Sequence, residues 1–145
     1  RRALAQHPEI LARQATLWGG NLAMIASLMG TPWLPAVPRG VLFLEDVAEH
    51  PYRVERMLLQ LLHAGILDQQ QAILLGQFTQ YRTGPMDRGY NLKKVVDYLR
   101  AHTRTPILTN LPFGHVPTKV LLPVGASVDL VITGSEALLL WGHLH

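Results

Sequence analysis

The chain has 145 residues, a length expected for one globular domain. Hydrophobic residues make up 48% of it and charged residues 16%, a composition that excludes an intrinsically disordered chain. The net charge of +3 is small, and the basic residues form no run interleaved with aromatic ones, so we expect no nucleic-acid partner.

Two further features limit the class of protein. The chain has no cysteine, which excludes disulfides and thiolate metal sites and fits a reducing compartment. No apolar run approaches the roughly 18 to 20 residues of a membrane helix, and no signal peptide is visible, so we expect no membrane partner. The sequence starts at Arg1 without a methionine, from which we expect the domain to be part of a longer protein.

The first part of the chain reads as a connection into the main domain. Arg1–Gln14 is expected to form a partly helical lead-in. An apolar helix should follow, with Asn21 as its N-cap and Gly30 as its stop, and then an extended, proline-rich linker. We therefore assign residues 1–38 to a lead-in, helix and linker from an upstream half, and residues 39–145 to the domain proper.

The stretch from Gly40 onward organises the rest of the chain. Val41–Leu44 is a short apolar run that predicts a buried strand. Pro51 begins a helix with apolar residues at the spacing of one buried face, and Ala72–Leu75 supplies a second strand. A strand, a crossover helix and a strand predict parallel pairing.

The remaining segments add one helix and more strands. Asn91 is the expected cap of a further helix, and Pro106–Thr109 is a third short strand. Val120–Leu122 and Ser127–Ile132 are expected to form a hairpin. Together the elements predict an α/β fold with a mixed sheet and two to three helices.

The candidate catalytic groups are few. Glu45 and Asp46 follow the first predicted strand, at the carboxyl edge where α/β folds place their sites. Adjacent side chains of a strand point to opposite sides, so at most one of them faces a given cleft. A purely structural role, accepting N–H bonds from the following turn, is the alternative for either carboxylate.

The other candidates are one histidine and one glycine pair. His115 lies in a tight loop, where catalytic side chains are often held. Gly19–Gly20 precedes a helix N-terminus, which indicates either a tight turn or an anion-binding end. A metal site from Glu45, His50 and His63 has no recognised ligand spacing, so we expect no metal.

The serines of the chain are its candidates for a catalytic nucleophile. Its three serines are Ser27, Ser127 and Ser135, and none lies in a G-x-S-x-G elbow. The chain therefore offers no convincing nucleophile of its own.

Five segments are familiar in this order. They are GGNL at Gly19–Leu22, FLEDV at Phe43–Val47, PYRVERML at Pro51–Leu58, GILDQQQAILLGQF at Gly65–Phe78 and LPFGHVPTKVLLPVGA at Leu111–Ala126. Over roughly residues 16–135 the chain resembles the C-terminal half of the LD-carboxypeptidases, serine peptidase family S66. The resemblance implies a swivelling β/β/α type of C-terminal domain, here residues 39–145, joined to an upstream domain.

The same resemblance implies an activity and its residues. Members of this family are similar to a cytoplasmic enzyme of peptidoglycan recycling that cleaves the terminal D-alanine from murein tetrapeptides. The family uses a Ser–Glu–His triad, and we expect no cofactor. Glu45 corresponds to the glutamate of FLEDV and His115 to the histidine of PFGHV, while the serine belongs to the upstream domain. Gly20 and Asn21 match a segment that borders the cleft and are candidate substrate contacts. The resemblance also implies a homodimer, for which Leu138–Trp141 is a candidate surface, with ordinary burial in the core as the favoured alternative for these residues.

Three alternatives remain open at this point. A branch of the same family hydrolyses peptide–nucleotide antibiotics and gives self-immunity. The second alternative is a non-catalytic binding or assembly domain, in which Glu45 and His115 are structural. The third is a metal-binding domain.

Overall fold

The computed structural model describes residues 8–46, 49–78, 92–109, 124–134 and 136–142. In these residues six strands form one mixed sheet in the order β4-β3-β2-β1-β5-β6, accompanied by three α-helices. The elements are β1 (Glu9–Asn21), α1 (Leu22–Leu28), β2 (Val41–Asp46), α2 (Pro51–His63), a 3-10 turn (Leu67–Gln69), β3 (Ala72–Phe78), α3 (Leu92–His102), β4 (Ile107–Leu108), β5 (Ser127–Thr133) and β6 (Glu136–Trp141). The expected α/β class with a mixed sheet is confirmed.

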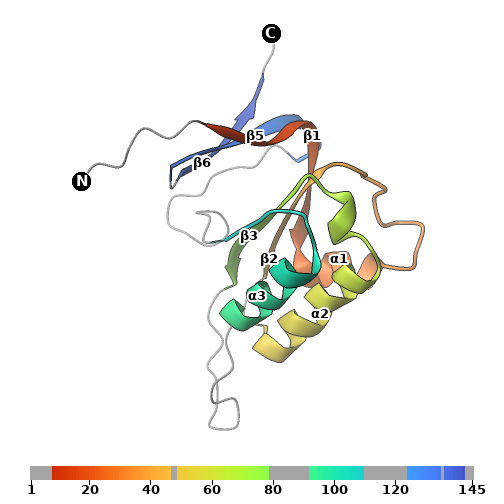
Figure 1. Ribbon diagram of the computed structural model, residues 1–145. Coiled ribbons are helices and arrows are strands. Elements are labelled where there is room, and N and C mark those ends of the chain that lie inside the picture. Colours follow the sequence, from red (N-terminus) through yellow and green to blue (C-terminus); the bar gives the residue numbers. More distant parts are fainter. Residues whose placement is uncertain (1–7, 47–48, 79–91, 110–123, 135, 143–145) are drawn as a thin grey trace.

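The parallel half of the sheet carries the helices. β1 pairs with β2, β2 with β3 and β3 with β4, all in parallel, and the three helices cover one face of these strands (Figure 1). α2 begins at Pro51, and the Nδ1 atom of His50 accepts a hydrogen bond from the Tyr52 N–H at 3.1 Å. Because Pro lacks an N–H and His50 bonds another one, both residues suit a helix start.

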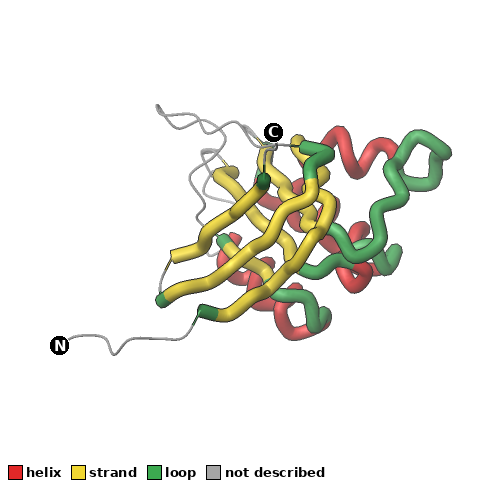
Figure 2. The backbone as a smooth tube through the Cα atoms, turned by 90° about the horizontal axis from the view of Figure 1, so that it is seen from above, coloured by secondary structure: helices red, strands yellow, loops and turns green. Residues whose placement is uncertain are grey.

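The antiparallel half is built on the first part of β1. This strand pairs with β5, and β5 pairs with β6, both antiparallel. Two register irregularities interrupt the β1–β5 ladder, between Ile10 and Ala12 and between Ala12 and Ala15. Bulges of this kind bend a strand, and from above the strands form one curved layer with the helices on one side (Figure 2).

Apolar side chains fill both faces of the parallel strands. Leu42 and Leu44 of β2 pack with the helices, while Val41 and Phe43 pack with β1, β3 and β5. A strand buried on both faces reads as a continuous apolar run, which is why Val41–Leu44 shows no alternation in the sequence. The predicted strand and its parallel pairing with β3 are therefore confirmed.

The prediction for the beginning of the chain is wrong where the structure tests it. Glu9–Gln14 is not helical but forms the first half of β1, and residues 1–7 lie outside the described residues. The two bulges remove the period of two that marks a strand in sequence. The helix after it is confirmed, because α1 runs from Leu22 to Leu28 with Asn21 as its N-cap.

The expected hairpin takes a different form in the described residues. Ser127–Thr133 is a strand, as predicted, but its partners are β1 and β6. The other predicted strand, Val120–Leu122, lies outside the described residues, as does the expected cap Asn91. The division after residue 38 stays a prediction, and β1 on one side of it pairs directly with β2 on the other.

Within the described part of the chain, none of the helices has both the length and the apolar character that crossing a membrane requires.

The two glycines at the end of β1 give a first test of the fold. Gly19 has φ +127°, and a Cβ built on it would lie 2.0 Å from the backbone oxygen of Phe43, whereas Gly20 has φ +135° and a Cβ there would meet nothing within 4 Å. We expect Gly20→Ala to cost about 1 to 3 kcal/mol through backbone strain alone. Gly19→Ala adds a clash with backbone and should cost more or prevent folding. Urea unfolding of both variants measures this, and equal losses would contradict the β1–β2 contact described here.

Candidate active site

Four parallel strands end at the same edge of the sheet. β1 ends at Asn21, β2 at Asp46, β3 at Phe78 and β4 at Leu108. Because the carboxyl ends of parallel strands meet, this edge brings together residues that are far apart in sequence. It is the edge at which the sequence predicts the site.

The two carboxylates of β2 have separate environments. Asp46 is 3% exposed, and its oxygens accept hydrogen bonds from Asn21 Nδ2 and from the Ala23 N–H, each at 3.1 Å. These contacts put Asp46 on the face that carries the helices. Alternation along the strand then assigns Glu45 to the face of Phe43, opposite the helices.

Glu45 is partly buried, and one of its oxygens has an unusual position. Its Oε1 atom is inaccessible to solvent, and no group among the described residues donates a hydrogen bond to it. A buried oxygen without a donor costs about 1 to 3 kcal/mol, and a charged one more. The Oε1 atom of Glu45 can therefore accept a hydrogen bond from a side chain outside the described residues or from a bound molecule.

The ladder between β2 and β3 is irregular at this point, with the extra residue on β3. Leu44 pairs with Leu75 of β3, but Asp46 pairs with Phe78, so the register shifts across Glu45. On the other side, Glu45 is paired in register with Asn21 of β1. Irregularities of this kind are common next to active sites, where they re-aim a side chain.

Of the expected substrate contacts, Asn21 is the register partner of Glu45, and Gly20 is the register partner of Leu44. The positive φ of Gly20 explains the glycine without reference to a ligand. Asn21 is engaged on both sides of its amide, since Oδ1 accepts from the Met24 N–H at 2.9 Å and Nδ2 donates to Asp46. The N–H groups of Ala23 and Met24 therefore have partners within the protein, which removes two donors from the proposed anion-binding end.

The remaining candidates are distributed as follows. His115 and Ser135 lie outside the described residues. Ser27 is in α1, where its hydroxyl donates to the Met24 carbonyl at 2.7 Å. His50 and His63 sit at opposite ends of α2, and within the described ranges no three His, Asp or Glu residues are grouped as metal ligands.

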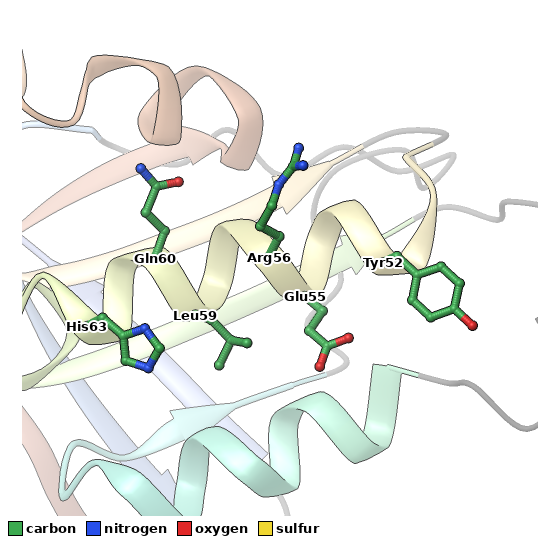
Figure 3. A pocket seen from close by; sticks show the side chains of 6 residues that line it. All are labelled: Tyr52, Glu55, Arg56, Leu59, Gln60 and His63. Carbon is green, nitrogen blue, oxygen red and sulfur yellow. The ribbon is translucent and has the colours of Figure 1, made fainter.

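A separate hollow lies on the outer surface of α2. It has a volume of about 580 Å³ and is lined by Tyr52, Glu55, Arg56, Leu59, Gln60 and His63. Glu55, Leu59 and His63 point toward α3, whereas Arg56 and Gln60 point away from it (Figure 3). All six lining residues belong to α2, so this hollow does not include Glu45.

The link between Asn21 and Asp46 is the feature of this edge that the sequence does not predict. The two residues are 25 positions apart, and their contact depends on the parallel register of β1 and β2. The available signal, an N-cap asparagine after two glycines, indicates a helix start but gives no information about a partner strand.

Solved structures share this architecture. The chain superposes on a muramoyltetrapeptide carboxypeptidase from Oxalobacter formigenes with a TM-score of 0.81 and 45% identity, covering 92% of this chain and 45% of that one. It also matches the microcin C7 self-immunity protein MccF with a TM-score of 0.73, but at 22% identity this likeness shows the fold alone.

Sequence comparison assigns the family. A family model for the LD-carboxypeptidase C-terminal domain matches residues 14–130, so the chain belongs to the LD-carboxypeptidase family. It is 35% identical over 118 residues to the murein tetrapeptide carboxypeptidase of Pseudomonas aeruginosa, covering 81% of this chain and 38% of that protein. A probable murein peptide carboxypeptidase of Bacillus subtilis is 33% identical over 118 residues, covering 81% of this chain and 37% of that protein. The chain thus spans less than half the length of these relatives.

The two carboxylates should respond differently to neutralisation. Asp46→Asn replaces an acceptor oxygen by a donor in a buried pair, and should lower the free energy of unfolding by about 1 to 3 kcal/mol. Glu45→Gln loses no hydrogen bond to a described residue, and should lower the free energy of unfolding by less than Asp46→Asn does. Urea denaturation of the two variants measures the difference. A larger loss for Glu45→Gln than for Asp46→Asn would contradict these environments.

Proposed function

We propose that the chain is the part of a serine LD-carboxypeptidase that supplies Glu45 and His115 to a Ser–Glu–His triad. The observation that carries the proposal is the buried Oε1 atom of Glu45, which has no donor among the described residues at the carboxyl edge of the sheet. A triad carboxylate accepts a hydrogen bond from the second nitrogen of its histidine, so it needs an oxygen reserved for that purpose.

Chain length allows the histidine to reach this oxygen. β4 ends at Leu108 on the same edge as Glu45, and His115 is six residues beyond Thr109. Six residues span at most about 20 Å. β4 lies two strand positions from β2, about 10 Å at normal strand spacing. The topology therefore supports a contact between two residues that are seventy positions apart.

The chemistry follows from the roles of such a triad. His115 takes the proton of the serine hydroxyl as that oxygen attacks the carbonyl carbon of the scissile amide. His115 then gives the proton to the nitrogen of D-alanine as the C–N bond breaks. In the second half, His115 takes a proton from water as the water oxygen attacks the acyl carbon, and returns it to the serine oxygen as the ester C–O bond breaks. Glu45 holds the imidazole in the required tautomer and stabilises the imidazolium that forms between the steps.

The serine itself would come from an upstream domain. The chain covers less than half of its relatives, and none of its serines lies in a nucleophile elbow. A murein tetrapeptide is the substrate we propose, because relatives at 35 to 45% identity carry names that specify murein or muramoyl tetrapeptides. We propose the backbone of Gly20 and Asn21 as a substrate contact, since the Asn21 side chain is already bonded within the protein.

Two further proposals concern the environment of the parent protein. Leu138 and Leu140 of β6 are 44% and 52% exposed, which supports a homodimer that uses this strand. The lack of cysteine supports a reducing compartment such as the cytoplasm.

The proposal predicts a large effect of both triad residues in the full-length parent. Glu45→Gln and His115→Ala should each lower kcat for D-alanine release from a murein tetrapeptide by about 10³-fold or more. The matched controls are Glu55→Gln on the outer surface of α2 and His102→Ala at the end of α3, which should stay within about threefold of wild type. An inactive wild type would exclude this substrate, and a loss of only a few fold would remove the residue concerned from the mechanism.

The isolated chain should be inactive, because the nucleophile is supplied from elsewhere. Residues 1–145 alone are expected to release no D-alanine above a buffer blank, while the parent protein at the same concentration does. Turnover that survives repurification of the isolated chain would show that it holds its own nucleophile.

A further inference from the structure

Asp46 connects three elements next to the proposed triad glutamate. It directly follows Glu45 in β2, one of its oxygens accepts from Asn21 at the end of β1, and the other accepts from Ala23 in the first turn of α1. The side chain is 3% exposed, so these charge-assisted bonds are shielded from water. The positive end of the helix dipole at α1 favours a carboxylate in this place.

This connection lies where the ladder from β2 to β3 is irregular. The ladder to β3 shifts its register between Leu44 and Asp46, so β3 gives Glu45 no regular pairing. On the other side, Glu45 is paired with Asn21 of β1, and that same residue is bonded by Asp46. The bond between Asn21 and Asp46 thus joins the two strand ends that flank Glu45.

We infer that Asp46 is a positioning residue for the reaction, acting through Asn21 and Ala23 to hold Glu45 at the geometry the triad requires. The inference rests on the proposed function. A displacement of about 1 Å at a catalytic group is enough to cost about 100-fold in rate, without any loss of substrate binding. Asp46 should therefore act on kcat rather than on KM.

The hydrogen-bond pattern offers a test by exchange of the two side chains. In Asp46→Asn the new amide nitrogen faces the amide nitrogen of Asn21, and in Asn21→Asp two carboxylates face each other. In the double variant N21D/D46N, the carboxylate at position 21 still accepts from the Met24 N–H, and the amide oxygen at position 46 still accepts from the Ala23 N–H. The bond between the two exchanged side chains survives with its direction reversed. The exchange thus restores all three contacts without restoring either original residue.

The experiment measures kcat and KM for D-alanine release by the full-length parent, on folded protein confirmed by circular dichroism. Asp46→Asn should lose about 10- to 100-fold in kcat with KM within about threefold, and N21D/D46N should return to within about fivefold of wild type. The control is Asp129→Asn, because the Oδ1 of Asp129 accepts from the Gln14 N–H at 2.7 Å in the antiparallel half of the sheet. It should lower the unfolding temperature while leaving kcat unchanged.

Three results would overturn the inference. Normal kcat in Asp46→Asn means that the residue is only structural, and a double variant no better than the single one means that the contact is not what matters. A raised KM in every Asn21 variant, the double included, means that the Asn21 amide binds substrate directly. If Asp46→Asn does not fold, the double variant still decides between these outcomes. An inactive wild type, or an unaffected Glu45→Gln, is instead a failure of the proposed function.

Discussion

The parallel pairing of β1 with β2 is the constraint on which the site depends. It aligns Asn21 with Glu45, and it brings the carboxylate of Asp46 within hydrogen-bond distance of both Asn21 and the first turn of α1. One buried carboxylate thereby joins two strand ends and a helix start, at the place where the ladder to β3 becomes irregular. The adjacent carboxylate is on the opposite face and keeps an oxygen without a donor among the described residues. Two neighbouring residues of the same chemical type thus have different environments, because a strand turns successive side chains to opposite faces.

The packing of β2 explains how the fold tolerates the buried carboxylate of Glu45, which costs free energy of folding. The apolar residues of β2 before Glu45 are buried on both faces, between the helices on one side and the strands of the other half of the sheet on the second. Such a strand is held firmly enough to keep a carboxylate where burial disfavours it. A buried carboxylate oxygen with no donor among the described residues is costly, and such costs are typical of positions kept for function.

Much of the central unit is readable from the sequence, while the contacts that complete the site are not. The apolar run at Val41–Leu44, Pro51 at a helix start and the second run from Ala72 predict a strand–helix–strand unit, because each signal is local and agrees with the others. The sequence misleads at Glu9–Gln14 because two bulges conceal the strand period, and the bond between Asn21 and Asp46 is invisible because no local pattern encodes the register of two parallel strands. Glu45 is a candidate from its place after a strand, but the burial of its Oε1 atom away from every donor among the described residues is a property of packing that only the structure reveals.

The central claim is that the Oε1 atom of Glu45 accepts a hydrogen bond from the ring of His115 in the parent protein. Nuclear magnetic resonance of the ¹⁵N-labelled parent tests this directly, because an imidazole N–H bound to a buried carboxylate is strongly deshielded and slow to exchange. The account predicts one such proton in the wild-type protein that is lost in both His115→Ala and Glu45→Gln and retained in His102→Ala. A deshielded ring proton that persists without Glu45, or a wild-type spectrum without one, would contradict it.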